Sequence, residues 1–189
     1  MQSTRQITKA MEMVAASKLR RAQAQVLKAR PYFETLYDTI DQIAQTNQEF
    51  SSAYLTPRPV KKVAWIVFAG DRGLAGGYNS NVLKLAYSQM EGKNVTVLPV
   101  GKKASDFFRS RGCEILTDSY VEAEDVSVGD CFSMSKLLCK QYLAGEVDEV
   151  YVAYTNFISV LSQVPKTLQI LPLLRQEEAE KATTGDILY

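Results

Sequence analysis

The 189-residue sequence contains no histidine, one tryptophan and three cysteines. Cys113, Cys131 and Cys139 are odd in number and lack the paired CxxC spacing of a zinc site, which argues against a disulfide framework and against a bound metal. We expect buried or neutral thiols in a reducing compartment, and no cofactor. Without histidine, general acid–base catalysis would depend on carboxylates or lysines.

Long apolar runs are also missing. No stretch reaches the length that a membrane-crossing helix needs. Near the start, the apolar residues between Ile7 and Leu19 are interrupted by Lys9, Glu12 and Lys18, which argues against a signal peptide. The composition is that of a soluble protein, so we expect neither a membrane span nor export.

The acidic residues form no recognisable catalytic group. Asp118, Glu122, Glu124 and Asp125 lie close together in the sequence, in a loop with few apolar neighbours that would raise their pKa. We interpret this segment as a solvated acidic loop, not as an active site.

A long helical pattern dominates the first 49 residues. From Ala15 onward the apolar positions are spaced alternately by four and three, which is a heptad pattern. A helix of this length spans roughly 70 Å at about 1.5 Å per residue, more than its own domain can cover, so it needs a helical partner. Pro31 lies within the register, and we predict a kink there and not an end. We call these positions the seam: Ala15, Leu19, Ala22, Val26, Ala29, Phe33, Leu36, Ile40 and Ile43.

Charge is distributed unevenly along the chain. Residues 1–30 hold seven basic residues and one acid, a net charge of +6, whereas the remainder holds 15 basic and 20 acidic residues. A solvated face is the ordinary explanation of such a segment. Nucleic acid, anionic lipid and an acidic protein are alternatives. The segment lacks aromatic residues and a recognition motif, and its apolar side is mostly alanine, so an acidic protein partner is favoured over nucleic acid or a membrane surface.

Residues 60–172 alternate between strand and helix patterns. Strands are predicted at 62–69, 95–100, 114–117 and 149–154, with helices at about 80–90, 104–111 and 131–144; Val82, Leu83, Ala86 and Met90 form the inner side of the first helix. The last strand, 163–171, contains Pro165 and is predicted at an antiparallel edge. The fold class is α/β: a long N-terminal coiled-coil helix (1–50), a connector (51–59) and a Rossmann-like three-layer domain with a mainly parallel sheet (60–172).

A glycine-rich turn, Gly70 to Asn79, follows the first predicted strand. Its glycines, Gly70, Gly73, Gly76 and Gly77, have GxxGxxGG spacing, which matches neither GxGxxG nor GxxxxGK[ST]. One interpretation is a phosphate site of a nucleotide-binding enzyme, with the long helix as an oligomerisation arm. The favoured interpretation is a tight structural turn that needs several positive φ angles.

Two motifs resemble segments of the gamma subunit of F-type ATP synthases. They are residues 6–22 (QITKAMEMVAASKLRRA) and residues 71–79 (DRGLAGGYN). The segments Ser162–Pro165 and Asp186–Tyr189 add to the resemblance, which covers nearly the whole chain and is closest to bacterial sequences.

The resemblance implies a rotor, the central stalk inside a hexamer of three alpha and three beta subunits. It further implies contacts with the epsilon subunit and the membrane c-ring, on the cytoplasmic face of the bacterial plasma membrane, without insertion into the membrane and without nucleic acid. Nucleotides would bind to alpha and beta, so this chain would have no catalytic residues and the glycine turn would be structural. A C-terminal helix beyond Tyr189, reached through a linker at 173–189, would cover the seam.

The resemblance also implies roles for single residues. Acidic loops of beta would meet the basic face of the long helix, and Tyr189 would lie near the c-ring. The residues expected to face beta are Lys9, Met11, Met13, Lys18, Arg20 and Arg21.

Overall fold

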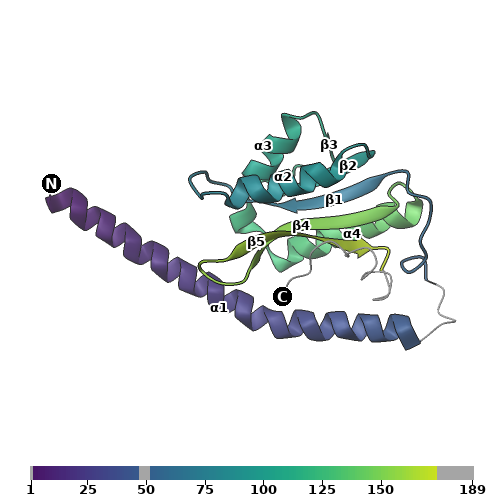
Figure 1. Cartoon of the computed structure of the whole chain (residues 1–189), viewed down its shortest axis with the longest axis horizontal. Coiled ribbons are helices and arrows are strands. Elements are labelled where there is room, and N and C mark those ends of the chain that lie inside the picture. The colour runs from purple at the N-terminus through teal and green to yellow at the C-terminus, as the bar shows by residue number, and fades with distance from the viewer. Residues whose placement is uncertain (1, 47–51, 174–189) are drawn as a thin grey trace. The chain divides into compact units, whose positions relative to one another are not determined.

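The computed structural model describes residues 2–46 and 52–173. By its internal contacts the chain divides into two units, one that contains residues 2–46 and one that contains residues 52–173. The first contains the long helix, and the second contains a sheet with helices on both faces (Figure 1).

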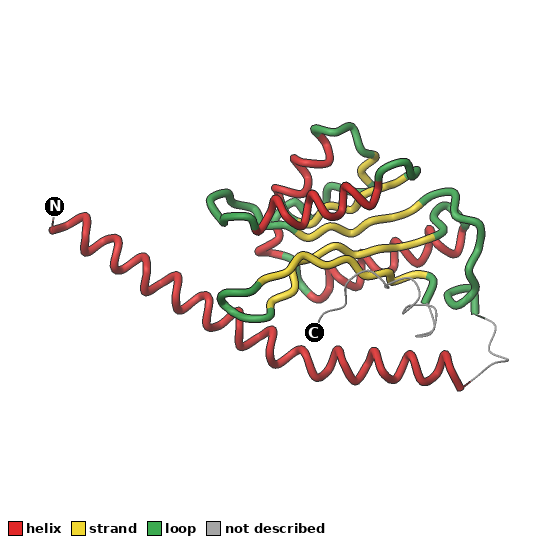
Figure 2. Tube along the Cα trace, viewed as in Figure 1, coloured by secondary structure: helices red, strands yellow, loops and turns green. Residues whose placement is uncertain are grey.

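Helix α1 runs from Gln2 to Thr46 without interruption, and Pro31 lies inside it. Pro31 has no N–H to donate, yet the helix continues, as predicted, and Figure 2 shows the axis of α1 bending near its middle. The hydroxyl of Thr35 donates to the carbonyl oxygen of Pro31 at 2.8 Å, just beyond this point. No helix within the described residues is both long enough and apolar enough to cross a bilayer.

Five strands form one sheet in the order β3-β2-β1-β4-β5. Strands β1 to β4 are parallel to one another, and β5 pairs antiparallel with β4 at the edge, which confirms the predicted arrangement. The strands are β1 (Val63–Phe68), β2 (Val95–Val100), β3 (Glu114–Ile115), β4 (Glu149–Phe157) and β5 (Gln163–Leu171).

Helices cover both faces of this sheet and make it the middle of three layers (Figure 1). Alternate residues of a strand point to opposite faces. Trp65 of β1 therefore packs in the core with α2 (Tyr78–Met90) and α3 (Lys102–Arg109), whereas Ile66 packs with α4 (Val128–Ala144). Both cores need apolar side chains, which explains the continuous apolar run of β1. The predicted α/β fold class is confirmed.

Most predicted boundaries hold, and the differences have local causes. Helix α2 buries Val82, Leu83, Ala86 and Met90, as predicted. Helix α4 begins three residues earlier than predicted because Ser127 caps it: its side chain accepts from the N–H of Asp130, whose carboxylate accepts from the N–H of Ser127.

Three other elements differ in their bounds from the sequence-based prediction. Strand β4 extends to Phe157 and not only to Tyr154, because pairing with β5 continues to the hairpin. Helix α3 begins at Lys102, two residues early, and ends at Arg109. Strand β3 has two residues and not four.

Candidate functional site: the exposed helix and the glycine turn

The seam of α1 is exposed to solvent. The side chains of Leu19, Val26, Phe33, Leu36 and Ile40 are 37–55% exposed, and Ala15, Ala22 and Ala29 are exposed as well. The side chain of Ile43 lies outside the described part. Single exposed apolar residues are ordinary on protein surfaces, but a contiguous row along a helix is typical of an interaction surface.

The six residues predicted to face beta do not share one side of α1. At about 100° per residue, Lys9, Met13 and Arg20 lie within about 40° of one another and roughly opposite the centre of the seam. Met11 and Lys18 fall along the seam itself, and Arg21 lies on its flank. All six are exposed. The helix therefore has an apolar side and a partly basic side, which we call the outer face and define by Lys9, Met13 and Arg20.

The glycine turn is held together from inside by Asn79. Its Oδ1 accepts from the N–H of Gly70 at 2.7 Å, and its Nδ2 donates to the carbonyl oxygen of Arg72 at 3.1 Å. We expected several positive φ angles in this turn, and it has two. Of the four glycines only Gly76 has one, at 56°, and the other positive φ of the turn, 62°, belongs to the fully exposed Leu74.

Asp71 connects this turn to two other loops. Its carboxylate accepts from the N–H groups of Lys102 at 3.0 Å, Ala123 at 2.9 Å and Glu124 at 3.1 Å. Partial burial alone would raise the pKa of Asp71, but these three donors and the charge of Arg72 outweigh it, so the pKa lies below its ordinary value. The ionised carboxylate thus lies at the N-terminus of α3, where a bound phosphate would meet its negative charge.

Gly101 allows these loops to approach each other. A Cβ atom at this position would lie 2.0 Å from the carbonyl oxygen of Ala69, and its φ of 97° disfavours any other residue. The sequence analysis gave neither Gly101 nor Asp71 a role, because both act through contacts with distant segments. The turn has the construction of a structural junction.

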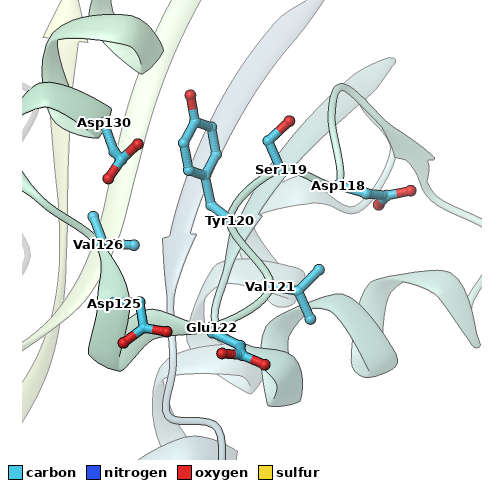
Figure 3. A pocket seen from close by; sticks show the side chains of 8 residues that line it. All are labelled: Asp118, Ser119, Tyr120, Val121, Glu122, Asp125, Val126 and Asp130. Carbon is cyan, nitrogen blue, oxygen red and sulfur yellow. The ribbon is translucent and has the colours of Figure 1, made fainter.

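The acidic loop surrounds a cavity of about 290 Å³, shown in Figure 3. Its acids have different surroundings: Asp118 points away from the others and pairs with Arg109, while Asp130 is bonded to Ser127. Glu122 and Asp125 are exposed. Among the described residues, no three histidine, cysteine or acidic side chains are grouped so that they could hold a metal ion.

Residues 174–189, which include Tyr189 and most of the predicted linker, lie outside the described residues. What the described part presents is a long helix with an unpartnered apolar side, joined to an α/β domain whose loops are tied to one another. This construction is typical of a structural or interaction subunit.

Comparison with known proteins places the chain in a family. Residues 1–189 match the family model described as ATP synthase, and the chain belongs to that family. It is 42% identical over 188 residues to the ATP synthase gamma chain of Alkaliphilus metalliredigens. That alignment covers 97% of this chain and 65% of the relative. It is 38% identical over 189 residues to the gamma chain of Pelotomaculum thermopropionicum, covering 99% and 66%.

The particular branch is therefore that of the ATP synthase gamma chains, and this chain spans slightly less than two thirds of the length of these relatives. The fold is similar to a chain in the central stalk and c-ring structure of the Tetrahymena thermophila mitochondrial ATP synthase. That match has a TM-score of 0.63 at 22% identity and covers 97% of this chain and 80% of the other.

Proposed function

We propose that this chain is the central-stalk, or rotor, subunit of an F-type ATP synthase. It would couple ion flow through the membrane sector to ATP synthesis and hydrolysis in a hexamer of three alpha and three beta subunits. The observation that supports this most is the match of the whole chain to the ATP synthase family, together with the unpartnered seam of a 45-residue helix.

In this proposal the seam binds a C-terminal helix of the same polypeptide. The gamma chains to which this chain is similar are longer, so they have residues to provide such a helix. Alanines at three seam positions allow close approach of two helices, and the larger side chains between them supply apolar contact. Residues 1–50 would form the shaft, 51–59 the connector, 60–172 the foot domain, and 173–189 the linker back to the shaft.

The outer face of α1 would meet acidic loops of the beta subunits. Lys9, Met13 and Arg20 lie opposite the seam, so pairing along the seam leaves them free to contact the hexamer. Arg21 would contribute from the flank of the seam, whereas Lys18 and Met11, also predicted to face beta, fall along the seam. Ion pairs near water are individually weak, so these contacts would affect coupling between conformations more than affinity.

The foot domain would contact the epsilon subunit and the c-ring, with Tyr189 near the ring. The complex would be peripheral to the cytoplasmic face of a bacterial plasma membrane. This chain would contribute no catalytic residue and bind no nucleotide, because the Gly70–Asn79 turn is filled by its own Asn79 and bordered by the charge of Asp71.

Co-purification tests the proposal. The chain, extended to the length of its relatives, is co-expressed with alpha and beta subunits, one of which carries the affinity tag. We expect one copy of this chain for each hexamer. Absence from the tagged complex, or tight stoichiometric binding of ATP or NAD by the isolated chain in calorimetry, would contradict the rotor function.

Charge reversal tests the four basic residues that are predicted to face beta. Replacing Lys9, Lys18, Arg20 and Arg21 together by glutamate is expected to lower proton-driven ATP synthesis in a reconstituted complex more than it lowers assembly. The matched control reverses Lys28 and Arg30, which are also exposed. Unchanged synthesis in the fourfold variant would remove these residues from the mechanism.

A further inference from the structure

Residues 52–62, which lead into β1, are fixed firmly on the α/β domain. Pro57 and Pro59 predict a stiff, extended connector, but stiffness alone would leave its direction free. In the structure the segment is attached at both ends. The N–H of Leu173, just after β5, donates to the carbonyl oxygen of Tyr54 at 2.7 Å, so the points where the chain enters and leaves the domain are bonded to each other.

Arg58 makes the central attachment. Its Nε lies 2.8 Å from Oδ1 of Asp148, its Nη2 donates to the carbonyl oxygens of Tyr142 and Val147, and its guanidinium lies 4.3 Å from the centre of the Tyr142 ring. The side chain of Asp148 is only 7% exposed. One arginine of the connector therefore holds both the end of α4 and the residues that lead into β4.

Asp148 fixes the next two residues of the connector. Its Oδ2 accepts from the N–H groups of Lys61 at 2.7 Å and Lys62 at 3.1 Å, and its own N–H donates to the carbonyl oxygen of Lys62 at 2.8 Å. Burial alone would raise the pKa of Asp148, but these donors and Arg58 outweigh it, so the pKa lies below its ordinary value. The carboxylate stays ionised and accepts from all of its donors at neutral pH.

Residues 52–62 belong to the α/β unit by their contacts, although they form no strand or helix. Connecting segments between folding units are ordinarily exposed and make few contacts with either unit. Here an ion pair to a buried carboxylate, two carbonyl contacts and an arginine stacked on a tyrosine attach the segment 52–62 to the rest of the domain. We call the set Tyr54, Arg58, Tyr142 and Asp148 the connector clamp.

We infer that the connector clamp is the joint that carries torque between the shaft and the foot domain, with Arg58 and Asp148 as positioning residues that keep the connector from twisting. The inference rests on the proposed rotor function. A loose connector would absorb rotation as a change in its own backbone angles, whereas a clamped connector passes it to α4 and β4.

Two conservative variants test the clamp. Asp148→Asn keeps an acceptor for the N–H groups of Lys61 and Lys62 but loses the negative charge. Arg58→Lys keeps the positive charge but loses the guanidinium group that reaches the carbonyl oxygens of Tyr142 and Val147. The matched control is Asp71→Asn, which weakens the same domain away from the connector. On the isolated chain, we expect amide hydrogen exchange at Lys61, Lys62 and Leu173 to become at least tenfold faster in both clamp variants and to stay unchanged in the control. Unchanged exchange in the clamp variants would overturn the inference, whatever the chain's function.

The second measurement uses the assembled complex, with the hexamer fixed to a surface and a bead on the foot domain. The angular stiffness of the stalled rotor is expected to fall at least twofold in both clamp variants, with ATP hydrolysis by the hexamer unchanged and the control as stiff as the unsubstituted rotor. Full stiffness in the clamp variants would overturn the inference while leaving the rotor function intact. Failure of the unsubstituted chain to assemble would overturn the rotor function and the inference with it.

Discussion

Replacement of Asp71 by alanine is expected to destabilise the α/β domain by about 2–3 kcal/mol. Hydrogen bonds to charged groups contribute about 1.5–3 kcal/mol each, and a buried donor left without a partner costs about 1–3 kcal/mol. Of the three donors, the N–H groups of Lys102 and Glu124 are at exposed contacts and can turn to water. Only the Ala123 N–H is partly buried, so the expected loss of unfolding free energy stays well below the sum for three independent hydrogen bonds.

Urea unfolding followed by tryptophan fluorescence measures this loss. Trp65 is the single tryptophan, it is 1% exposed, and it lies in β1 at the centre of the sheet, so its signal reports on the α/β domain. The control is Asp118→Ala, which removes an exposed ion pair with Arg109 and is expected to cost less than about 1 kcal/mol. Equal losses for the two variants, or no loss for Asp71→Ala, would refute the structural role of the carboxylate.

The same contact predicts a pH dependence with a definite sign. The folded-state pKa of Asp71 lies below the unfolded value, so its contribution to stability is complete above an unfolded pKa of about 3.9 and is lost as pH falls through the lower folded value. The stability difference between the original chain and Asp71→Asn is therefore expected to shrink on acidification below about pH 4. A difference that is constant down to acid unfolding would contradict the ionised carboxylate.

Three further outcomes are expected. Gly101→Ala destabilises the domain by at least about 2 kcal/mol in urea, because its Cβ would clash with Ala69, whereas Gly73→Ala, with open space around it, has little effect. Ser127→Ala costs about 1 kcal/mol and speeds amide exchange at Asp130, while Ser133→Ala, which removes only an exposed intrahelical contact, does not. In the chain extended to the length of its relatives, Leu19→Asp combined with Leu36→Asp lowers the melting temperature of the paired helices, measured by circular dichroism, without moving the Trp65 transition. The control Ala24→Asp, on the opposite side of α1, lowers that melting temperature less. Equal shifts in the two variants would argue against the seam as a helix-pairing surface.

The elements that sequence reasoning found are those whose signal is local. The apolar run of β1 and the 3.6-residue period of α2 depend only on neighbours in the sequence, and both were found with small boundary errors. The early start of α4 was also encoded locally, since Ser127 and Asp130 form a capping box that the prediction did not use.

The contacts that organise the loops and the connector could not be found in this way. Asp71 meets residues more than 30 positions away, and Arg58 meets Asp148 across 90 positions, so no spacing rule relates the partners. The six residues that the resemblance implies to face beta remain a prediction; their angles around the helix divide them between the outer face and the seam, a division that the resemblance alone did not provide. Periodicity showed that the seam needs a helical partner but left its identity open, and the family resemblance led to the proposal of a C-terminal helix.

Rotation itself tests the central claim most directly. Cys131 is exposed, whereas Cys113 and Cys139 are half-buried, so a bead can be attached to the foot domain through Cys131. With the chain extended to the length of its relatives and assembled in a surface-fixed hexamer of alpha and beta subunits, ATP is expected to drive steady rotation of the bead in one direction. A complex that hydrolyses ATP with the chain bound and the bead stationary would contradict the rotor function.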